Sequence, residues 1–413
     1  MPDALPKSLG NYTIMFESLS AIPEDPLLGV MTAYRRDPNP LKVDLGVGVF
    51  KTEDGLTPLP AAIANAARAL AAEQTTKVYV GQAGNERFNQ AILQLTLGVH
   101  HEAPIWGRAR ALQAPGGCGA LRIGAELIRA ANPNAAIYVS DPTWANHIPL
   151  LGNVGLAIER YPYLDRKAGT VNLAGMLTRL DALPAGSTVL LHGCCHNPTG
   201  ADLTNEEWLC LVELLERRRL VPFVDMAYQG LADSLEADAY GARLLVSRLP
   251  EVLVAVSCSK NFGVYRERTG AIIIASEDSK SVDVAMAHLR RIARGIYSMP
   301  PDHGAELVAR VWERQELRAQ WQAELDSMCQ YLNAQREALA ARLGALCNEG
   351  DYSFLTRQRG MFSLLPLTES QIYRLREAHH IYMAADGRIN VAGINSHNVD
   401  YLAESVATVV QHA

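Results

Sequence analysis

Between residues 110 and 275, short runs of apolar residues alternate with stretches in which apolar residues recur every three or four positions. Apolar runs of four to seven residues, bounded by Gly, Pro, Asn or Asp, are typical of strands buried on both faces. These runs predict strands at 111–114, 135–140, 154–160, 188–191, 221–225, 252–257 and 271–275. Strands that alternate with helices indicate βαβ units and a mostly parallel sheet, which binds ligands at the carboxyl ends of its strands.

The periodic stretches between these strands predict helices, among them 118–131 and 204–218. The second begins with Thr204 and carries Glu207 three residues later, which is the sequence pattern of a capping box. Beyond residue 300 the pattern changes to that of an α+β region. The predicted elements there are a long helix at 312–346, strands near Phe354 and Phe362, a helix at 369–379, a strand at 388–391 and a final helix at 398–410.

The N-terminal part of the chain predicts a proline-containing arm, a helix at 26–35 and an extended segment at 43–50. The helix at 312–346 is long enough to bridge two domains. We therefore predict an α/β protein in three parts. These are an N-terminal arm at 1–13, a large domain at 51–327, and a smaller domain built from both chain ends, 14–50 and 328–413.

The composition excludes several classes of protein. Apolar residues make up 48% and charged residues 20% of the 413 residues, as in packed globular proteins and unlike disordered chains. The net charge of -6 gives no electrostatic reason to bind nucleic acid or an anionic membrane surface. No apolar run approaches the roughly 18–20 residues of a membrane-spanning helix, and neither chain end shows a targeting signal, so we expect a cytoplasmic protein.

The seven cysteines include the adjacent pair Cys194–Cys195 but no CxxC motif, so we expect reduced thiols rather than a disulfide scaffold. Residues 192–196, His-Gly-Cys-Cys-His, are the one cluster of metal-ligand types, and a zinc site is an alternative there. Asn-Pro-Thr-Gly follows directly at 197–200 and marks a loop with another use. We therefore expect no metal.

Lys260 has the most distinctive surroundings of the seven lysines. It follows the apolar strand at 252–257 and precedes Asn261-Phe262-Gly263. A lysine at the carboxyl end of a buried strand should have a lowered pKa, and such an amine can act as a base or as a nucleophile that forms a Schiff base. The alternative is a lysine that only pairs with an anion.

Asp225 ends another buried strand, and Tyr228 follows three residues later. A strand-end carboxylate can orient a cation or a protonated ring nitrogen, although a helix cap is the commoner use of such a residue. Asn197 follows the strand at 188–191 in a loop that Pro198 and Gly200 make rigid, so it should face the same edge of the sheet.

A glycine-rich turn, Pro115-Gly116-Gly117-Cys118-Gly119, lies between a predicted strand and a predicted helix. Backbone N–H groups at the start of a helix, together with the helix dipole, bind phosphate groups. The spacing is neither the GxGxxG of dinucleotide-binding folds nor a Walker loop. Glycine-rich turns between strands and helices are common, so this turn by itself is a weak indication.

Taken together, the glycine-rich turn, Asn197, Asp225 with Tyr228, and Lys260 follow an order that resembles fold-type I pyridoxal-phosphate enzymes. The chain looks most like the class I aminotransferases of the aspartate and aromatic amino acid branch. The resemblance runs from Asp25-Pro26-Leu27-Leu28-Gly29 to Gly387-Arg388-Ile389-Asn390-Val391-Ala392-Gly393. It implies a large domain with a mostly parallel seven-stranded sheet and a smaller α+β domain.

The resemblance also implies roles for residues around the pyridoxal ring. Lys260 would form the Schiff base with the cofactor and later move the substrate proton. Asp225 would keep the pyridine nitrogen protonated, with His147 behind it. Tyr228 and Asn197 would hydrogen-bond the phenolic oxygen. Trp144 would stack on the ring, and with Asn197 it would also border the substrate.

The cofactor phosphate, by the same resemblance, would be bound by Gly117, Cys118, Ser257, Ser259 and Arg268, with Tyr79 reaching in from a partner subunit. Cys118 departs from the family pattern, which usually has a hydroxyl residue there. Because a thiol is a weak donor, we expect the backbone N–H of Cys118 to matter more than its side chain.

Two arginines are implied to bind the substrate. Arg388 would hold the α-carboxylate as a two-bond fork, and Gly48 would let the backbone approach the same carboxylate. Arg294 would reach across a homodimer to the distal carboxylate of aspartate or glutamate. Met299 departs from the aspartate-type pattern, whereas Lys51 and Thr57 match it.

We therefore expect a homodimeric enzyme that moves an amino group from L-aspartate, and from aromatic amino acids, to 2-oxoglutarate, giving oxaloacetate and L-glutamate. The alternative within the family is an aromatic or broad-specificity aminotransferase with aspartate as a secondary substrate. Two other classes are disfavoured. A non-catalytic binding module does not explain Lys260, and a dinucleotide oxidoreductase explains neither Lys260 nor Arg388.

Overall fold

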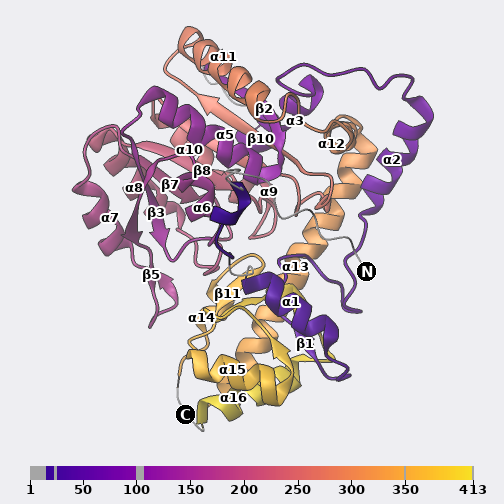
Figure 1. The fold of residues 1–413 in the computed structure, drawn as a ribbon. Coiled ribbons are helices and arrows are strands. Elements are labelled where there is room, and N and C mark those ends of the chain that lie inside the picture. Colours follow the sequence, from indigo (N-terminus) through magenta and orange to yellow (C-terminus); the bar gives the residue numbers. More distant parts are fainter. Residues whose placement is uncertain (1–14, 23–25, 99–106, 348–349, 412–413) are drawn as a thin grey trace, which may run out of the picture.

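The computed structural model describes residues 15–22, 26–98, 107–347 and 350–411 (Figure 1). The predicted N-terminal arm, residues 1–13, lies outside the described residues. No helix in the described ranges is both long and apolar enough to cross a membrane.

A seven-stranded sheet forms the centre of the larger part of the molecule. Its strands lie in the order β2, β10, β9, β8, β7, β3, β4. β10 is antiparallel to both of its neighbours, and the remaining pairings are parallel, which confirms the mostly parallel sheet. The strand bounds are β2 Ala109–Pro115, β3 Ala136–Asp141, β4 Ala157–Pro162, β7 Thr188–His192, β8 Val221–Met226, β9 Val252–Ser257 and β10 Thr269–Ala275.

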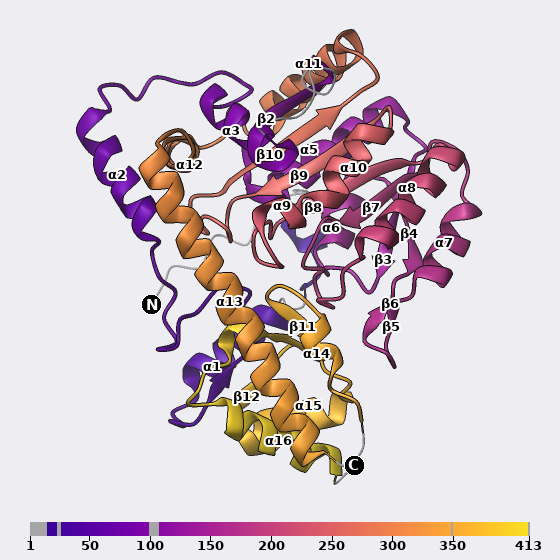
Figure 2. The same ribbon diagram turned by 180° about the vertical axis from the view of Figure 1, so that it is seen from behind.

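Two hydrophobic clusters cover the two faces of this sheet, because successive side chains of a strand point to opposite faces. In β8, Phe223 belongs to the cluster with α5 and α11, whereas its neighbour Val224 belongs to the cluster with α8 and α10. Figures 1 and 2 show these helices around the sheet. The bounds of the helices that cover the sheet are α5 Gly116–Ala131, α7 Leu173–Asp181, α8 Asn205–Arg218, α10 Tyr240–Arg248 and α11 Ser279–Ile296.

Near the β2 edge of the sheet, α12 (His303–Glu313) packs against α2 (Ala61–Glu73) and α3 (Glu86–Leu97). α13 (Gln315–Leu346) then runs from this region to the smaller part of the molecule (Figure 2). The short elements of the larger part are α6 His147–Gly152, β5 Leu164–Asp165, β6 Thr170–Val171 and α9 Leu235–Asp238.

The smaller part combines segments from both ends of the chain. β1 (Val43–Asp44) pairs in parallel with β12 (Ile381–Tyr382), and β11 (Phe362–Leu364) pairs antiparallel with β13 (Arg388–Asn390). These pairings agree with a domain built from both chain ends, and its residue bounds stay a prediction. The other elements are η1 Met15–Ser18, α1 Pro26–Arg36, α14 Phe354–Arg357, α15 Glu369–His379, η2 Val391–Gly393 and α16 Val399–Gln411.

Two predicted elements differ from the structure: the helix at 312–346 is confirmed only from residue 315 onward, and the strand near Phe354 was wrong. The single helix expected at 312–346 is divided at Arg314, whose extended backbone separates α12 from α13. The strand expected near Phe354 is the short helix α14, in which the adjacent residues Phe354 and Leu355 are both buried. Two neighbouring apolar residues show neither a two-residue nor a four-residue period, so their pattern does not separate strand from helix.

Candidate active site

A cavity of about 290 Å³ opens at the carboxyl ends of the parallel strands. Large-domain loops and the smaller part of the molecule both contribute to its wall. The predicted site residues that line it are Gly48, Gly117, Cys118, Trp144, Asn197, Asp225, Tyr228, Ser257, Ser259, Lys260, Arg268 and Arg388.

Tyr79 and Arg294 do not line this cavity. Tyr79 is 87% exposed on the segment after α2. Arg294 is exposed in the last turn of α11, and its Nη1 donates a hydrogen bond to Ser298 Oγ at 2.6 Å. Both residues were predicted to act in the site of a neighbouring subunit, and that role stays a prediction.

Lys260 follows β9 and points toward the ring of Tyr228, with its Nζ 4.9 Å from the ring centroid. Burial lowers the pKa of the Lys260 amine, and Arg268 lowers it further, while Asp225 and Cys118 act in the opposite direction. The net pKa lies below the ordinary value for lysine, so a larger fraction of the amine is neutral at any given pH. A neutral amine can attack a carbonyl carbon or accept a proton.

Asp225 is the penultimate residue of β8, and the Nε2 atom of His147 lies 3.0 Å from Asp225 Oδ2. This is the contact predicted for His147. The other ring nitrogen of His147 lies 2.8 Å from Thr143 Oγ1, which orients the ring. Burial raises the pKa of the Asp225 carboxyl, but the His147 hydrogen bond and nearby positive groups outweigh burial and place the pKa below its ordinary value. The carboxylate therefore stays ionised and can pair with a cationic ring nitrogen.

The glycine-rich turn places Gly117 and Cys118 in the first turn of α5, where backbone N–H groups have no partner within the helix. Ser257 and Ser259 lie opposite this turn. The Nη1 atom of Arg268 donates hydrogen bonds to Tyr265 O at 3.0 Å and to Ser259 Oγ at 3.5 Å. A Cβ atom at Gly117 would lie 3.1 Å from the Cβ of Ser257, so a side chain there would narrow the space between them.

Cys118 places its thiol in the same cavity, and the Asn146 amide lies 3.9 Å from its Sγ. Burial raises the pKa of the thiol. A neutral thiol adds no negative charge beside a bound phosphate.

Arg388 reaches the cavity from β13. It is 6% exposed, and its guanidinium donates to Asn197 Oδ1 at 3.3 Å and to Gly46 O at 3.1 Å. Its Nε has no hydrogen-bond partner, and among the described residues no carboxylate forms an ion pair with the guanidinium. Because a buried cation is stable only when paired, this arrangement points to an anionic ligand.

Sequence analysis did not single out Phe362, Leu121 and Ala227 as residues of the cavity wall. Phe362 lies in β11, which pairs with the strand of Arg388, and the guanidinium carbon lies 4.5 Å from the centre of its ring. The aromatic residue in a short strand was the available signal. Its place beside Arg388 depends on the strand register, which the sequence pattern does not reveal.

The five residues considered as a zinc site do not form one ligand set. His192 lies close to His147 and Asp225, whereas Cys194 and Cys195 lie close to Asp238. His196 hydrogen-bonds the hydroxyl groups of Ser140 and Thr199 instead. All seven cysteines are free, as predicted.

The donors around the cavity fit pyridoxal phosphate. The backbone N–H groups at the start of α5, the hydroxyls of Ser257 and Ser259 and the guanidinium of Arg268 suit the phosphate. A side chain in place of Gly117 would fill the space that the phosphate needs. Asp225 suits a protonated pyridine nitrogen, and the Lys260 amine suits the aldehyde carbon. The same residues do not fit a nicotinamide dinucleotide, because a dinucleotide-binding turn needs a different glycine spacing.

Comparisons with known proteins agree with this geometry. Residues 40–406 match the family "Aminotransferase class I and II". An aromatic-amino-acid aminotransferase of Pseudomonas aeruginosa is 41% identical over 95% of this chain and 98% of its own length. An aspartate aminotransferase of Escherichia coli is 39% identical over 96% of this chain and 100% of its own length.

The structure of an aromatic-amino-acid aminotransferase from Burkholderia pseudomallei, covalently bound to pyridoxal phosphate, superposes with a TM-score of 0.93 at 42% identity, covering 96% of this chain and 99% of that one. Sequence, fold and cavity therefore lead to the same conclusion. The chain belongs to the class I and II aminotransferases, a family of pyridoxal-phosphate-dependent enzymes.

Proposed function

We propose that this protein transfers the amino group of L-aspartate or of an aromatic amino acid to 2-oxoglutarate. The observation that carries the proposal is the buried Arg388 guanidinium, which has no carboxylate partner and faces the same cavity as Lys260. An amino acid or 2-oxo acid would supply that partner through its α-carboxylate. A two-bond guanidinium–carboxylate fork would also orient the α-carbon toward the Lys260 amine.

Each part of the cavity then has a role in the proposal. Gly117, Cys118, Ser257, Ser259 and Arg268 hold the cofactor phosphate. Asp225, kept ionised by His147, pairs with the ring nitrogen, while Asn197 and Tyr228 hydrogen-bond the ring oxygen and Trp144 covers one ring face.

When bound, pyridoxal phosphate supplies an aldehyde for amino-group exchange and a ring that takes up electron density. Lys260 binds the cofactor in the resting enzyme and, once released, takes the proton from the substrate α-carbon. Its lowered pKa allows this, because the amine must be neutral to accept a proton.

The proposed substrate range rests on the residues at the end of α11. Arg294 offers a charge partner for the distal carboxylate of aspartate or glutamate. Met299, close to it in the chain, and Val49, which lines a neighbouring groove, offer apolar surface for an aromatic side chain. Names of relatives from both substrate classes support the dual range.

Replacing Arg294 with Ala should separate the two substrate classes. A charged hydrogen bond contributes about 1.5–3 kcal/mol, so losing a two-bond fork should lower kcat/KM for aspartate by about 10²–10⁴-fold. An aromatic substrate does not need the fork, and its kcat/KM should change by less than about tenfold. Initial rates with a panel of amino donors and 2-oxoglutarate measure both effects.

Arg291→Ala is the matched control for this experiment, because Arg291 is exposed one turn earlier on the same helix. It should leave both substrates unaffected. If the parent enzyme transaminates aspartate but no aromatic amino acid, the apolar residues near Arg294 do not broaden its range. If it prefers aromatic substrates strongly, aspartate is the secondary substrate.

We also propose that the protein is a cytoplasmic homodimer with two shared active sites. Large apolar side chains are exposed on two segments of the large domain: Leu56 and Leu59 at 66% each, and Val78 at 75%. A groove of about 740 Å³ is lined in part by Leu59 together with Thr57 and His303. Exposed apolar surface of this kind suits burial against a second copy of the chain. The free cysteines suit a reducing compartment.

Mixed dimers test the shared sites. Lys260→Ala and Arg294→Ala subunits should each be inactive toward aspartate. In a mixed dimer, one site would contain both substitutions and the other neither, so aspartate activity should reappear. The activity of the mixture is measured after subunit exchange, which differently tagged subunits verify. Verified exchange without recovered activity would show that each subunit contains its own complete site.

A further inference from the structure

The two segments proposed to act in the partner's site lie side by side within one subunit. One is residues 74–85, between α2 and α3, which carries Tyr79. The other is residues 297–302, between α11 and α12, which follows Arg294 and carries Met299. A Cβ atom on Gly84 would lie 2.9 Å from Pro300 Cγ, so the two segments are in direct contact.

The side chain of Gln113 forms a hydrogen bond with each of these two segments. It lies on β2 and is fully buried. Its Oε1 accepts a hydrogen bond from the Asn85 backbone N–H at 2.8 Å, and its Nε2 donates to Pro301 O at 2.8 Å. Both ends of one side-chain amide are therefore used, one on each segment.

The side chain of Asn85 makes a second connection between the two segments. It is 7% exposed, and its Oδ1 accepts from Phe88 N at 3.1 Å, which caps α3. Its Nδ2 donates to Asp302 Oδ1 at 3.0 Å and to Glu306 Oε1 at 2.7 Å, at the start of α12. The cap and the connection use different atoms of the same amide.

The backbone conformation of the turn before Asn85 is also restricted. Gly84 has a φ of +78°, and a Cβ atom there would lie 2.3 Å from Gln113 Oε1. Only glycine combines this backbone angle with this close approach. The turn after Tyr79 is thus packed directly on the amide that holds Pro301.

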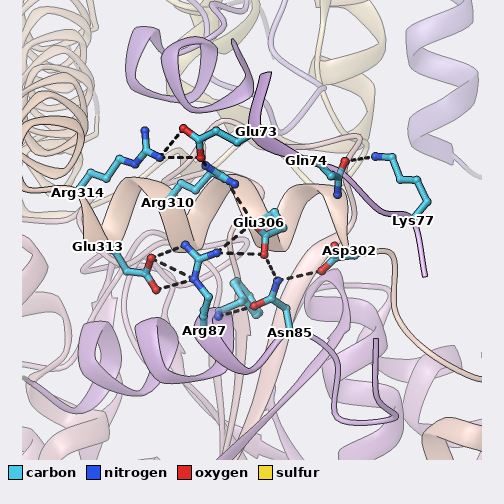
Figure 3. Close-up of polar contacts among 11 residues, drawn as sticks. Glu73, Gln74, Lys77, Asn85, Arg87, Asp302, Glu306, Arg310, Glu313 and Arg314 are labelled. Atoms are coloured by element: carbon cyan, nitrogen blue, oxygen red, sulfur yellow. Dashed lines mark hydrogen bonds and ion pairs between the residues drawn. The ribbon is translucent and has the colours of Figure 1, made fainter. Parts of the chain in front are cut away.

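Ion pairs between helices lie close to the Asn85 amide (Figure 3). Arg87 of α3 binds Glu313 and Glu306 of α12, and Glu73 at the end of α2 binds Arg310 and Arg314. Hydrogen bonds from Arg310 and Arg314 hold the pKa of Glu73 down to about 2. These pairs fix α2 and α3 to α12, whereas Gln113 and Asn85 act on the two segments themselves.

We propose that Gln113 and Asn85 are positioning residues that lock the Tyr79 segment to the segment that follows Arg294. The inference rests on the proposed function, in which Tyr79 contacts the partner's cofactor phosphate and Arg294 the partner's substrate. Because the two segments are held together, the contact of Tyr79 with the cofactor phosphate and the contact of Arg294 with the distal carboxylate depend on the same hydrogen bonds. Disturbing the lock weakens both at once.

Asn85→Asp is the sharpest variant. The carboxylate still caps α3, but it replaces the Nδ2 donor with an oxygen that faces Asp302 and Glu306. The dissociation constant for pyridoxal phosphate, measured by titrating the apoenzyme, should rise about tenfold, and so should KM for aspartate. The kcat value should change little, because Lys260 and Asp225 belong to neither segment.

Gln113→Glu is the second variant, and it keeps the acceptor for Asn85 N while removing the donor to Pro301 O. It should move the same two constants in the same direction. The double variant Asn85→Asp with Glu306→Gln exchanges amide and carboxylate across one of the two contacts, and it should recover part of the loss, because Asp302 still faces the new carboxylate. Circular dichroism and the melting temperature show whether each variant is folded.

Arg87→Ala is the control, because it removes exposed ion pairs between α3 and α12 but no amide contact. It should leave both constants within about twofold of the parent. An equal effect of Arg87→Ala would overturn the proposal in favour of general helix packing. Unchanged constants in folded Asn85→Asp and Gln113→Glu would also overturn it, provided that Arg294→Ala raises KM for aspartate. If Arg294→Ala has no effect, it is the proposed function that fails.

Discussion

Replacing Lys260 with Ala should abolish transamination while leaving a folded protein that still binds pyridoxal phosphate. Lys260 is the only lysine among the described residues of the cavity wall. Its loss removes both the covalent attachment and the group that moves the α-proton, and we expect turnover to fall by at least about 10⁴-fold. The phosphate contacts do not involve Lys260, so noncovalent binding of the cofactor should remain. Turnover and the visible spectrum of the bound cofactor measure the two parts of this result.

Lys167→Ala serves as the control for Lys260→Ala, because Lys167 is exposed outside the cavity. Its turnover and spectrum should match those of the parent. Borohydride reduction followed by peptide mapping locates the attachment directly. A cofactor reduced onto any other lysine would rule out the role of Lys260.

Replacing Asp225 with Ala should be nearly as damaging to the chemical step. The carboxylate is the group placed to keep the ring nitrogen protonated, and without it the ring takes up less electron density from the substrate. Losing the charge pair and the His147 hydrogen bond should lower the rate of the half-reaction by at least about 10²-fold. Single-turnover absorbance measurements with aspartate give this rate. The cofactor should still bind through its phosphate.

Asp225→Asn separates charge from shape, since an amide keeps the size of the side chain and a hydrogen bond to His147. It should be almost as slow as Asp225→Ala if the charge is what matters. Asp181→Ala, at a surface ion pair with Arg217, should have the parent rate. A half-reaction within tenfold of the parent in both Asp225 variants would contradict the role.

The fold was predictable where burial leaves a strong local pattern. All seven strands of the central sheet were found from their apolar runs. Six of them are largely buried, and strands covered on both faces need apolar residues at nearly every position. The edge strand β4 is the exception, because Tyr161 is its one buried residue. The largest boundary error is at the start of β4, which begins at Ala157 rather than at residue 154, because Gly155, with a φ of +87°, still belongs to the preceding turn. The errors at 312–346 and Phe354 arose where tertiary packing decides the conformation.

The break at Arg314 illustrates such a decision. Residues on both sides are helical in pattern, yet α12 packs on α2 and α3 while α13 runs to the smaller part of the molecule. Arg314 itself binds Glu73, more than 200 residues earlier in the chain. A partner at that distance leaves no mark on the local sequence.

By itself, the sequence determined the chemistry of the centre of the site. Lys260, Asn197 and the glycine-rich turn each come at or after the end of a recognisable strand, and Asp225 lies near the end of another. Parallel strands bring these carboxyl ends to one edge. Only the tertiary structure decided which groups reach that edge from the other domain, and how the exposed segments are held. Phe362 meets Arg388 through strand register. Gln113 joins Asn85 to Pro301, which lies 188 residues after Gln113 in the chain. The physical reason is that local patterns record burial and backbone preference, whereas contacts between distant segments depend on how complete elements pack.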